Sequence, residues 1–274
     1  MITMERAAAL LGELTQGALR LLYPPHCYLC GAPLEEGYLC PSCDAELPRL
    51  PLEGPLCARC GEPLADSEAD LCGECANRPW FFDRAQSFGF YEDGLAELVR
   101  GLKYRGERAL ARPLACYLRL AGEEFLQQAE ALTFVPLSPA KLRARGFNQA
   151  ELLARELGRL MGLPSVAALQ KIKQTEDQTE LSLKERRENV RGAFAPLGEA
   201  QFERIVLIDD VYTTGATAEE CSRALREGGY GEVYVLTVAR ARPPERGSRS
   251  QVPSSRFRNL GPMTWRKEAQ DSPT

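Results

Sequence analysis

One continuous segment, residues 204–217, joins an apolar strand, two acids, a turn rich in hydroxyl groups and the start of a helix. Residues 205–208 form a short run of Ile, Val and Leu that ends abruptly at Asp209 and Asp210, as expected for a buried parallel strand whose carboxyl end opens into a crevice. Ligands of open α/β sheets bind at that end of the strands. The segment therefore predicts an α/β protein with a parallel sheet and a binding site at the turn 213–217.

The turn supplies the groups that stabilise an anion. Backbone N–H groups, hydroxyls and the positive end of a helix dipole face one point there, and Gly215 permits a positive φ or a close approach to phosphate. We expect Asp209 and Asp210, at an exposed strand end, to hydrogen-bond vicinal hydroxyls or to hold a hydrated Mg²⁺. The alternative is a turn whose threonines only cap the helix. The predicted ligand-binding residues of the turn are Thr213, Thr214, Gly215, Ala216 and Thr217.

Eight of the ten cysteines fall into two clusters of paired Cys-x-x-Cys turns, a spacing typical of tetrahedral zinc sites. The predicted ligands are Cys27, Cys30, Cys40 and Cys43 in one cluster, and Cys57, Cys60, Cys72 and Cys75 in the other. We assign one structural Zn²⁺ to each cluster, although the spacing also permits an interleaved pairing of the first turn with the third and the second with the fourth. Disulfides are disfavoured in the reducing cytoplasm, and His26 is interpreted as a bystander beside the first ligand.

The cysteine region is acidic, because residues 27–78 carry ten Asp or Glu and three Lys or Arg. Four thiolates also leave each zinc site with a formal charge of −2. Such a module binds phosphate poorly, so we expect a structural role, or the docking of another protein or of the neighbouring domain. Its small size predicts that zinc supplies its folding energy, so chelation should loosen this module while the remaining domain stays folded.

Composition indicates a soluble protein, with 274 residues, 44% of them hydrophobic and 26% charged. Glu5 and Glu13 interrupt the apolar positions near the start, so residues 1–22 predict an amphipathic helix and neither a signal peptide nor a membrane span. We therefore expect a cytoplasmic protein. The formal net charge of −4 argues against a protein that coats nucleic acid over its whole surface.

Further elements are expected around the turn. Strands are predicted at 84–91, 132–136, around Val166 and at 233–239, with helices at 94–103 and 150–161. A loop at 137–149 carries cations and amides that suit pyrophosphate, namely Arg143, Arg145, Asn148 and Gln149, and Lys103 is counted with them. The polar stretch 171–178 is interpreted as a mobile lid.

Taken in order, the cysteine turns and five later motifs resemble the ComF family over about residues 23–242. The later motifs are Leu102-Lys-Tyr-Arg-Gly106, 135–149, Thr175-x2-Gln178, 187–194 and 209–217, the last of which also resembles the 5-phosphoribosyl-1-pyrophosphate (PRPP) signature of type I phosphoribosyltransferases. The resemblance implies a zinc-finger region, a phosphoribosyltransferase domain and a role in natural transformation. It also implies other competence proteins as partners that would dock on the zinc module. It places ribose and 5′-phosphate at Asp209, Asp210 and the turn, and pyrophosphate, with its Mg²⁺, near 143–149. Lys171 departs from the Arg usual in the family, which keeps the charge and loses bidentate geometry.

The expected organisation is a helix at 1–22, a double zinc ribbon at 23–80, a phosphoribosyltransferase-like domain at 84–242 and a disordered tail at 243–274. Two functions remain open. One is a competence protein that binds PRPP or a related phosphorylated ribose and handles single-stranded DNA during uptake. The other is an enzyme that transfers phosphoribose from PRPP to an unidentified nitrogen acceptor. The predicted DNA surface consists of Arg100, Lys103, Arg105, Arg143 and Arg145.

Overall fold

The computed structural model describes residues 24–50, 54–65, 68–173 and 183–242. The predicted helix 1–22, the tail 243–274 and most of the predicted lid lie outside these residues. Tertiary contacts divide the chain into two compact units, one made of Met1–Leu47 with Gly247–Thr274 and the other of Pro48–Arg246. The first cysteine cluster belongs to the smaller unit, whereas the second belongs to the same unit as the sheet.

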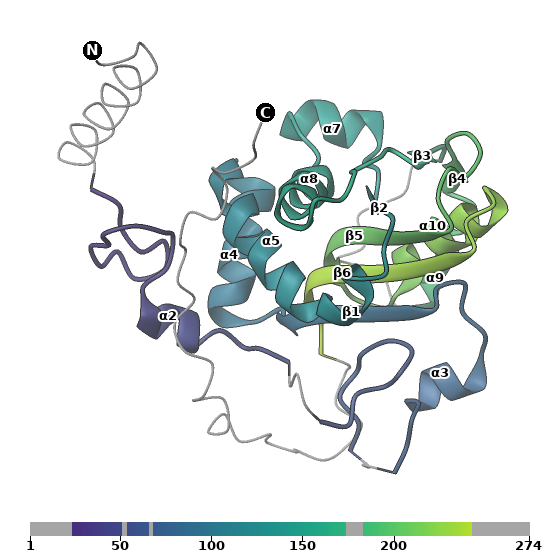
Figure 1. Cartoon of the computed structure of the whole chain (residues 1–274), viewed down its shortest axis with the longest axis horizontal. Helices are drawn as coiled ribbons and strands as arrows, with labels where there is room; N and C mark the ends of the chain where they lie inside the picture. The colour runs from purple at the N-terminus through teal and green to yellow at the C-terminus, as the bar shows by residue number, and fades with distance from the viewer. Residues whose placement is uncertain (1–23, 51–53, 66–67, 174–182, 243–274) are drawn as a thin grey trace, which may run out of the picture. The chain divides into compact units, whose positions relative to one another are not determined.

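A parallel sheet of four strands forms the centre of the larger unit (Figure 1). Its order is β1 (Arg84–Phe90), β6 (Glu232–Arg240), β5 (Arg204–Tyr212) and β2 (Ala131–Phe134), and every neighbouring pair is parallel. The strands predicted at 84–91, 132–136, 205–208 and 233–239 are confirmed, as is the α/β class with a parallel sheet and cysteine clusters ahead of it. The predicted strand around Val166 is reduced to a single parallel bridge between Leu132 and Ser165.

Helices cover the sheet on both sides. On one side α5 (Ala111–Ala121) packs against α8 (Gln149–Met161), and both contact the sheet, as α4 (Asp93–Tyr104) does (Figure 1). Helix α10 (Ala216–Glu227) packs with α9 (Leu183–Val190) and with the antiparallel pair β3 (Leu169–Lys171) and β4 (Phe194–Pro196). The short elements are α2 (Pro41–Ala45), α3 (Gly73–Asn77), η1 (Arg108–Leu110), α6 (Glu123–Leu126) and α7 (Pro139–Arg145).

The two faces of β5 and β6 pack into different parts of the core because side chains alternate along a strand. Ile205, Leu207, Val233 and Val235 join one hydrophobic cluster with apolar residues of α10. The four cysteines of the second cluster belong to that same group of buried residues. The second cysteine cluster is therefore part of the main core on the α10 side of the sheet.

The segment predicted as a loop at 137–149 contains the helix α7. Ser138 caps this helix by accepting a hydrogen bond from the backbone N–H of Lys141 at 3.3 Å, and Pro139 occupies its first turn. Gly146 ends the helix with φ of 77°. These local signals were present in the sequence, but the helix is too short for a hydrophobic period to reveal it. Among the described residues, we find no helix with the length and apolar character needed to cross a membrane.

Candidate functional site

A pocket of about 900 Å³ opens at the carboxyl ends of β5 and β2. The end of β5, the start of α10, the segment after β2 and the end of α4 all contribute to its wall. The predicted site residues that line it are Lys103, Arg145, Gln149, Asp209, Asp210, Thr213, Gly215 and Thr217. Four further predicted residues are not among the residues that line it, namely Arg143, Asn148, Thr214 and Ala216. Most of the predicted site residues therefore line one cavity. Its position agrees with the rule that ligands of open parallel sheets bind outside the carboxyl ends of the strands.

The two acids at the end of β5 differ in their surroundings. Asp210 is 4% exposed and contacts Lys103, whose Nζ lies 3.0 Å from Oδ1 and 2.9 Å from Oδ2. This burial differs from the exposed position expected from the sequence. Asp209 is half-buried, lines the pocket and accepts a hydrogen bond from the backbone N–H of Asp210 at 2.8 Å. Asp209 is thus the acid available to a ligand, and Asp210 is the counter-ion of Lys103.

The pKa values of Asp209 and Lys103 are both raised, but for different reasons. Burial, followed by repulsion from Asp210, raises the pKa of Asp209 to about 7, against attraction from Lys103. Burial disfavours the charged form of Lys103, but the carboxylates of Asp210 and Asp209 outweigh it and raise the pKa of Lys103. Lys103 is therefore a permanent cation, whereas Asp209 changes charge near neutral pH.

The turn after β5 has the geometry of an anion site. Gly215 precedes α10 with φ of 75°, a conformation that favours glycine, and Thr214 Oγ1 accepts a hydrogen bond from the N–H of Ala216 at 3.3 Å. The first N–H groups of a helix have no partner within the helix, and the helix dipole places partial positive charge beside them. Thr213 and Thr217 line the pocket at this point. A phosphate in the pocket would meet hydroxyls, N–H groups and the positive end of α10.

Asn148 and Gln149 lie at the opposite wall of the pocket, and of the two only Gln149 lines it. Asn148 is buried, donates to the carbonyl oxygen of Val135 at 3.0 Å and caps α8 by accepting from the N–H of Ala150 at 3.0 Å. Gln149 accepts a hydrogen bond from Arg145, whose guanidinium lies 5.5 Å from the centre of the Tyr104 ring. Tyr104 is 69% exposed, so an aromatic ring and a cation form the rim of the pocket.

Several lining residues lie outside the predicted set of ligand-binding residues. They include Tyr91, Arg105, Lys141, Lys171 and Tyr212. Arg105 belongs to the predicted DNA surface and Lys141 to the basic segment 137–149. The positions of α4 and α7 bring both residues to the wall of the pocket. Tyr212 lies within the motif 209–217, although the sequence did not single it out. Tyr91 has no local sequence signal for a site, because only the sheet register brings the end of β1 to the same edge as the end of β5.

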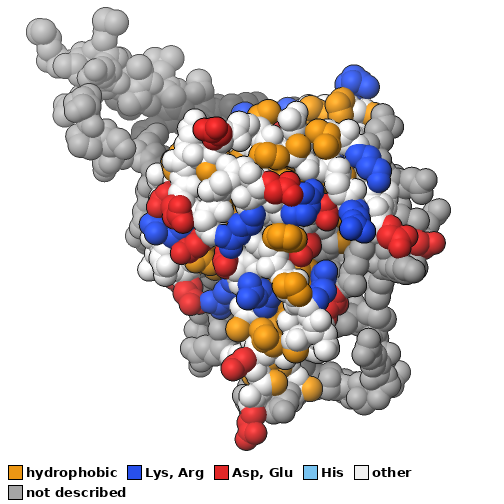
Figure 2. Space-filling view, turned by 90° about the vertical axis from the view of Figure 1, so that its right-hand side faces the viewer, with side chains coloured by type: hydrophobic (Ala, Val, Ile, Leu, Met, Phe, Trp, Pro, Cys, Tyr) orange, Lys and Arg blue, Asp and Glu red, His pale blue; other side chains and the backbone are white. Residues whose placement is uncertain are grey.

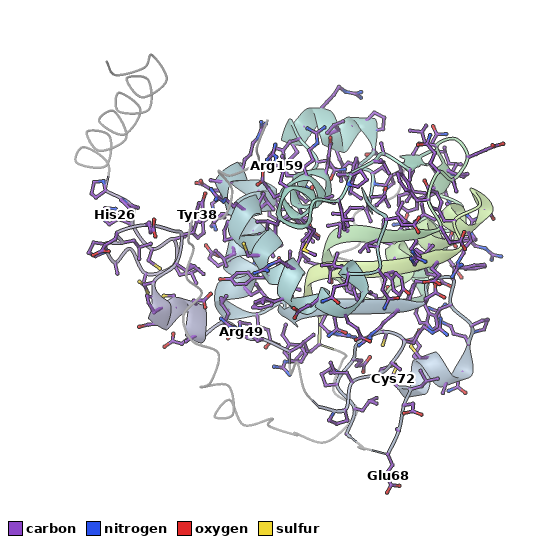
Figure 3. The ribbon with its side chains drawn as sticks, in the orientation of Figure 1. His26, Tyr38, Arg49, Glu68, Cys72 and Arg159 are labelled. Carbon is purple, nitrogen blue, oxygen red and sulfur yellow. The ribbon has the colours of Figure 1, made fainter. Side chains whose placement is uncertain are left out.

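The cysteines form two separate groups of four in sequence order. In each group the four Sγ atoms lie within 4.8 Å of one another, which resolves the pairing in favour of one site per cluster. The Sγ distance is 3.7 Å for Cys30 and Cys40 and 3.7 Å for Cys60 and Cys72. A tetrahedron with Zn–S bonds of about 2.3 Å has edges of about 3.8 Å, so both groups fit zinc. Figure 3 labels Cys72 just before α3, and also His26, which belongs to neither group.

Comparisons with known proteins agree with this arrangement. The model of the double zinc ribbon domain matches residues 18–76. The sequence is 34% identical over 212 residues to competence protein F of Haemophilus influenzae, covering 74% of this chain and 90% of that protein. It is 30% identical over 228 residues to DNA utilization protein YhgH of Escherichia coli K12, covering 80% and 99%. It is 28% identical over 200 residues to competence protein ComFC of Bacillus subtilis, covering 70% and 79%.

Among solved structures, the chain is similar to an allosteric regulatory enzyme of purine biosynthesis, with 23% identity and a TM-score of 0.31 over 47% of this chain and 25% of that one. It is also similar to a glutamine PRPP amidotransferase of B. subtilis, with 20% identity and a TM-score of 0.32 over 50% and 30%. The chain thus spans less than a third of these structures. The chain covers 90% of competence protein F and 99% of YhgH at 34% and 30% identity, and on that ground it belongs to the ComF family of competence proteins.

Proposed function

We propose that the pocket binds PRPP or a related phosphorylated ribose, and that the protein acts in the cytoplasm in the handling of single-stranded DNA during natural transformation. The observation that carries the proposal is the convergence of Asp209, Lys103 and the turn 213–217 on one cavity. The relatives' names, competence protein and DNA utilization protein, support the cellular role.

Each part of a phosphorylated ribose has a matching group in the pocket. The turn and the start of α10 would donate N–H and hydroxyl groups to the 5′-phosphate, and the carboxylate of Asp209 would accept hydrogen bonds from the ribose hydroxyls. Lys141, Arg145 and Lys171 would neutralise a pyrophosphate group. Mg²⁺ carried by the pyrophosphate would supply further charge neutralisation, with Asp209 as the nearby acid.

Calorimetric titration with PRPP and Mg²⁺ tests the site. We expect Asp209→Asn to cost about 1.5–3 kcal/mol of binding free energy, as does the loss of a charge-assisted hydrogen bond. Thr214→Ala should have a milder effect, because Thr214 Oγ1 supports the turn from outside the pocket lining. Glu130→Gln is the control, because Glu130 pairs with Arg204 at the opposite end of β5. Unchanged PRPP affinity in Asp209→Asn would contradict the assignment.

Because the pKa of Asp209 is raised, the effects of Asp209→Asn on stability and on PRPP binding should depend on pH. Its folded-state pKa of about 7 exceeds the ordinary value of 3.8, so its ionisation costs stability progressively as pH rises from about 4 to about 7. At pH 8 we therefore expect Asp209→Asn to melt at a higher temperature than the wild type while binding PRPP more weakly. In the wild type, Mg²⁺-dependent binding should strengthen between pH 6 and pH 8 as the carboxylate ionises. A flat pH profile would show that Asp209 does not contact the ligand or its metal.

Single-stranded DNA would bind at the rim of the same pocket. Tyr104 offers an exposed ring for base stacking, and Arg105 and Arg145 offer phosphate contacts beside it. Basic and acidic side chains lie interspersed on the face drawn in Figure 2. Lys103 is an unsuitable probe of DNA binding because it pairs with Asp210.

The DNA proposal is tested by fluorescence anisotropy at two salt concentrations. We expect Arg105→Glu combined with Arg145→Glu to weaken binding to any sequence and to flatten its salt dependence, because fewer counterions are released. Arg155→Glu combined with Arg159→Glu makes the same charge change on the exposed surface of α8 and is the matched control. Equal weakening by both pairs would contradict binding at the rim, and no affinity at low salt would remove direct DNA binding altogether.

A phosphoribosyltransferase activity is the second candidate. The pocket of about 900 Å³ extends past the acids to Tyr91 and Tyr104, which leaves room for an acceptor beside the phosphorylated sugar. In that reaction the bond from C1′ to pyrophosphate breaks, a bond from C1′ to the acceptor nitrogen forms, and the nitrogen loses a proton. Release of pyrophosphate from PRPP and Mg²⁺ with candidate nitrogen acceptors would establish the activity, and PRPP binding without turnover would favour the binding protein.

A further inference from the structure

The phosphate-binding turn lies directly against two aromatic side chains. A Cβ atom placed on Gly215 would lie 2.3 Å from Oη of Tyr212 and 3.2 Å from Cζ3 of Trp80. The backbone of the turn is therefore in contact with both rings, with no space for an added methyl group. The conformation of the turn depends on the positions of these two side chains.

Trp80 follows the last ligand of the second cysteine cluster by five residues. Its ring lies 5.0 Å from that of Phe82, which is fully buried, and the guanidinium of Arg78 lies 3.4 Å from its centre. Trp80 and Phe82 pack in the hydrophobic cluster that contains Cys57, Cys60, Cys72 and Cys75. The support of the turn is thus continuous with the second metal site.

Tyr212 is connected to the same metal site through Arg240. Tyr212 is 6% exposed, and the guanidinium of Arg240 lies 5.3 Å from its ring centre. Arg240 is 2% exposed and donates from Nη1 to the carbonyl oxygen of Cys60 at 2.8 Å. A zinc ligand, a buried arginine, an aromatic ring and the glycine of the turn therefore form one chain of contacts.

The helix that follows the turn is held by the same segment. The N–H of Phe81 donates to Oε2 of Glu219 at 3.0 Å, near the start of α10. Near the end of α10, Arg226 donates to the carbonyl oxygen of Phe81 at 3.1 Å and pairs with Asp83. Residues 78–83, directly after the second cluster, therefore contact α10 at both ends.

We propose that the second cysteine cluster, with zinc bound, is the scaffold of the phosphate-binding turn, and that Tyr212 and Trp80 are its positioning residues. Loss of zinc from this cluster releases the segment 78–83 and Arg240, so the turn loses its fixed conformation and its affinity for phosphate. Loss of zinc from the first cluster does not affect the turn. The ligand part rests on the proposed function, whereas the ordering of the turn does not.

The test compares full-length Cys72→Ser with Cys43→Ser, after metal analysis confirms that each has lost one zinc. Hydrogen exchange of residues 213–218 should accelerate at least about tenfold in Cys72→Ser only, since local protection depends on the contacts that hold a segment. Exchange in β2, on the far side of β5, is the internal reference. Affinity for ribose 5-phosphate should fall about tenfold or more in the same variant, because small displacements of binding groups have effects of this size.

The outcomes separate the two proposals. If the wild type binds neither ribose 5-phosphate nor PRPP, the proposed function fails, while hydrogen exchange still decides whether the second cluster holds the turn. If exchange of 213–218 is unchanged after loss of the second zinc, the scaffold proposal is wrong. Equal acceleration in both cysteine variants would also overturn it.

If Cys72→Ser does not fold, two matched pairs replace it. Tyr212→Leu should accelerate exchange at 213–218 and weaken ribose 5-phosphate binding, and Tyr212→Phe should restore both, whereas Tyr230→Leu removes a buried tyrosine of the same core cluster without either effect. Gly215→Ala should act like Tyr212→Leu. Gly162→Ala, with a similar φ of 69° and no atom within 4 Å, should not. Equal effects within a pair would show a general loss of stability and overturn the positioning role.

Discussion

The two cysteine clusters have nearly the same ligand spacing and very different surroundings. In the first cluster Cys27 is buried, Cys30 is exposed and Cys40 and Cys43 are half-buried. In the second, no ligand exceeds 9% exposure, and all four pack with apolar residues of β5, β6 and α10. The first is therefore a partly exposed metal site in a small unit, whereas the second is a metal site inside the core of a domain.

This difference changes what zinc does in each place. The smaller unit contains few buried side chains besides Cys27, namely Leu39, Asp44 and Leu47 among its described residues, so we expect zinc to supply most of its stability. The second zinc adds to a large hydrophobic core and fixes the segment that supports the pocket. The same motif thus serves local folding in one unit and the geometry of a binding site in the other.

The largest effect should come from removing a ligand of the second cluster. Structural zinc contributes on the order of 10 kcal/mol, comparable with the whole stability of a domain. We expect Cys75→Ser to lower the melting temperature of the sheet-containing unit severely, and Cys43→Ser to leave it near that of the wild type. Tryptophan fluorescence, which includes the signal of Trp80 beside the second cluster, and circular dichroism would follow unfolding. Chelation of both ions should then also unfold the larger unit, in contrast to the expectation from the sequence that this domain stays folded. Equal melting temperatures of the two variants would contradict the distinction between the two clusters.

A second prediction concerns the order in which zinc leaves. Purified protein should contain close to two Zn²⁺ per chain, and a chelator should remove them in two phases that differ in rate by at least about tenfold, because access and local opening control release. Cys30, the exposed ligand, offers a direct route to the first ion. A colour-forming chelator measures both phases, and Cys43→Ser should lack the fast one. Release of both ions in a single phase would contradict the idea that the different burial of the two clusters controls the loss of zinc.

Arg240 provides a smaller test of the link between the second cluster and the sheet. Arg240→Met leaves the carbonyl oxygen of Cys60 without its donor and Glu62 without its partner, which should cost about 1–3 kcal/mol. Arg242→Met is the control, because Arg242 is half exposed, pairs with Glu92 and lies over the ring of Phe90. Surface ion pairs contribute about 0–1 kcal/mol. Denaturant unfolding that gives the same loss for both variants would show that Arg240 does not connect the cluster to the core.

Much of this arrangement follows from local sequence. The strand at 205–208, the acids after it and the glycine turn before α10 were predictable because each carries a signal within a few residues. The cysteine spacing likewise predicts two four-ligand sites. By contrast, the pairing of Lys103 with Asp210 joins residues far apart in the chain, and nothing in either segment indicates the partner.

The different embedding of the two clusters has a sequence signal that spacing alone does not contain. Trp80, Phe81 and Phe82 follow the second cluster, whereas Asp44 and Glu46 follow the last ligand of the first. Large apolar side chains gain free energy from burial in a core, and Trp80 and Phe82 pack in one although Phe81 is exposed. After the first cluster, Glu46 is exposed and the buried Asp44 is a polar side chain that adds no apolar contact to a core. The particular contacts with Tyr212 and Gly215 still could not be predicted, because they depend on how residues 80–82 pack across more than a hundred residues of chain.

The smallest and most direct comparison uses the glycine that follows the second cysteine in each cluster. Gly31 and Gly61 have nearly the same φ, 73° and 67°, so alanine incurs the same backbone strain, about 1–2 kcal/mol. At Gly31 the added Cβ meets no atom within 4 Å, whereas at Gly61 it would lie 2.7 Å from the carbonyl oxygen of Ala85 in β1. A backbone atom of a central sheet cannot move away cheaply, so the crowding adds about 1–3 kcal/mol at Gly61.

We therefore expect Gly61→Ala to lower the stability of the sheet-containing unit by more than backbone strain alone, and Gly31→Ala to affect only the retention of the first zinc. Denaturant unfolding and the two-phase chelation assay measure these effects separately. Because the two substitutions are chemically identical and share one backbone conformation, any difference between them reports the surroundings of the clusters rather than the motif. Equal losses of stability in the larger unit would mean that the close contact of Gly61 with β1 contributes nothing to stability. The contrast between the exposed first cluster and the buried second cluster would then have no consequence at the position where the second cluster packs most closely against the sheet.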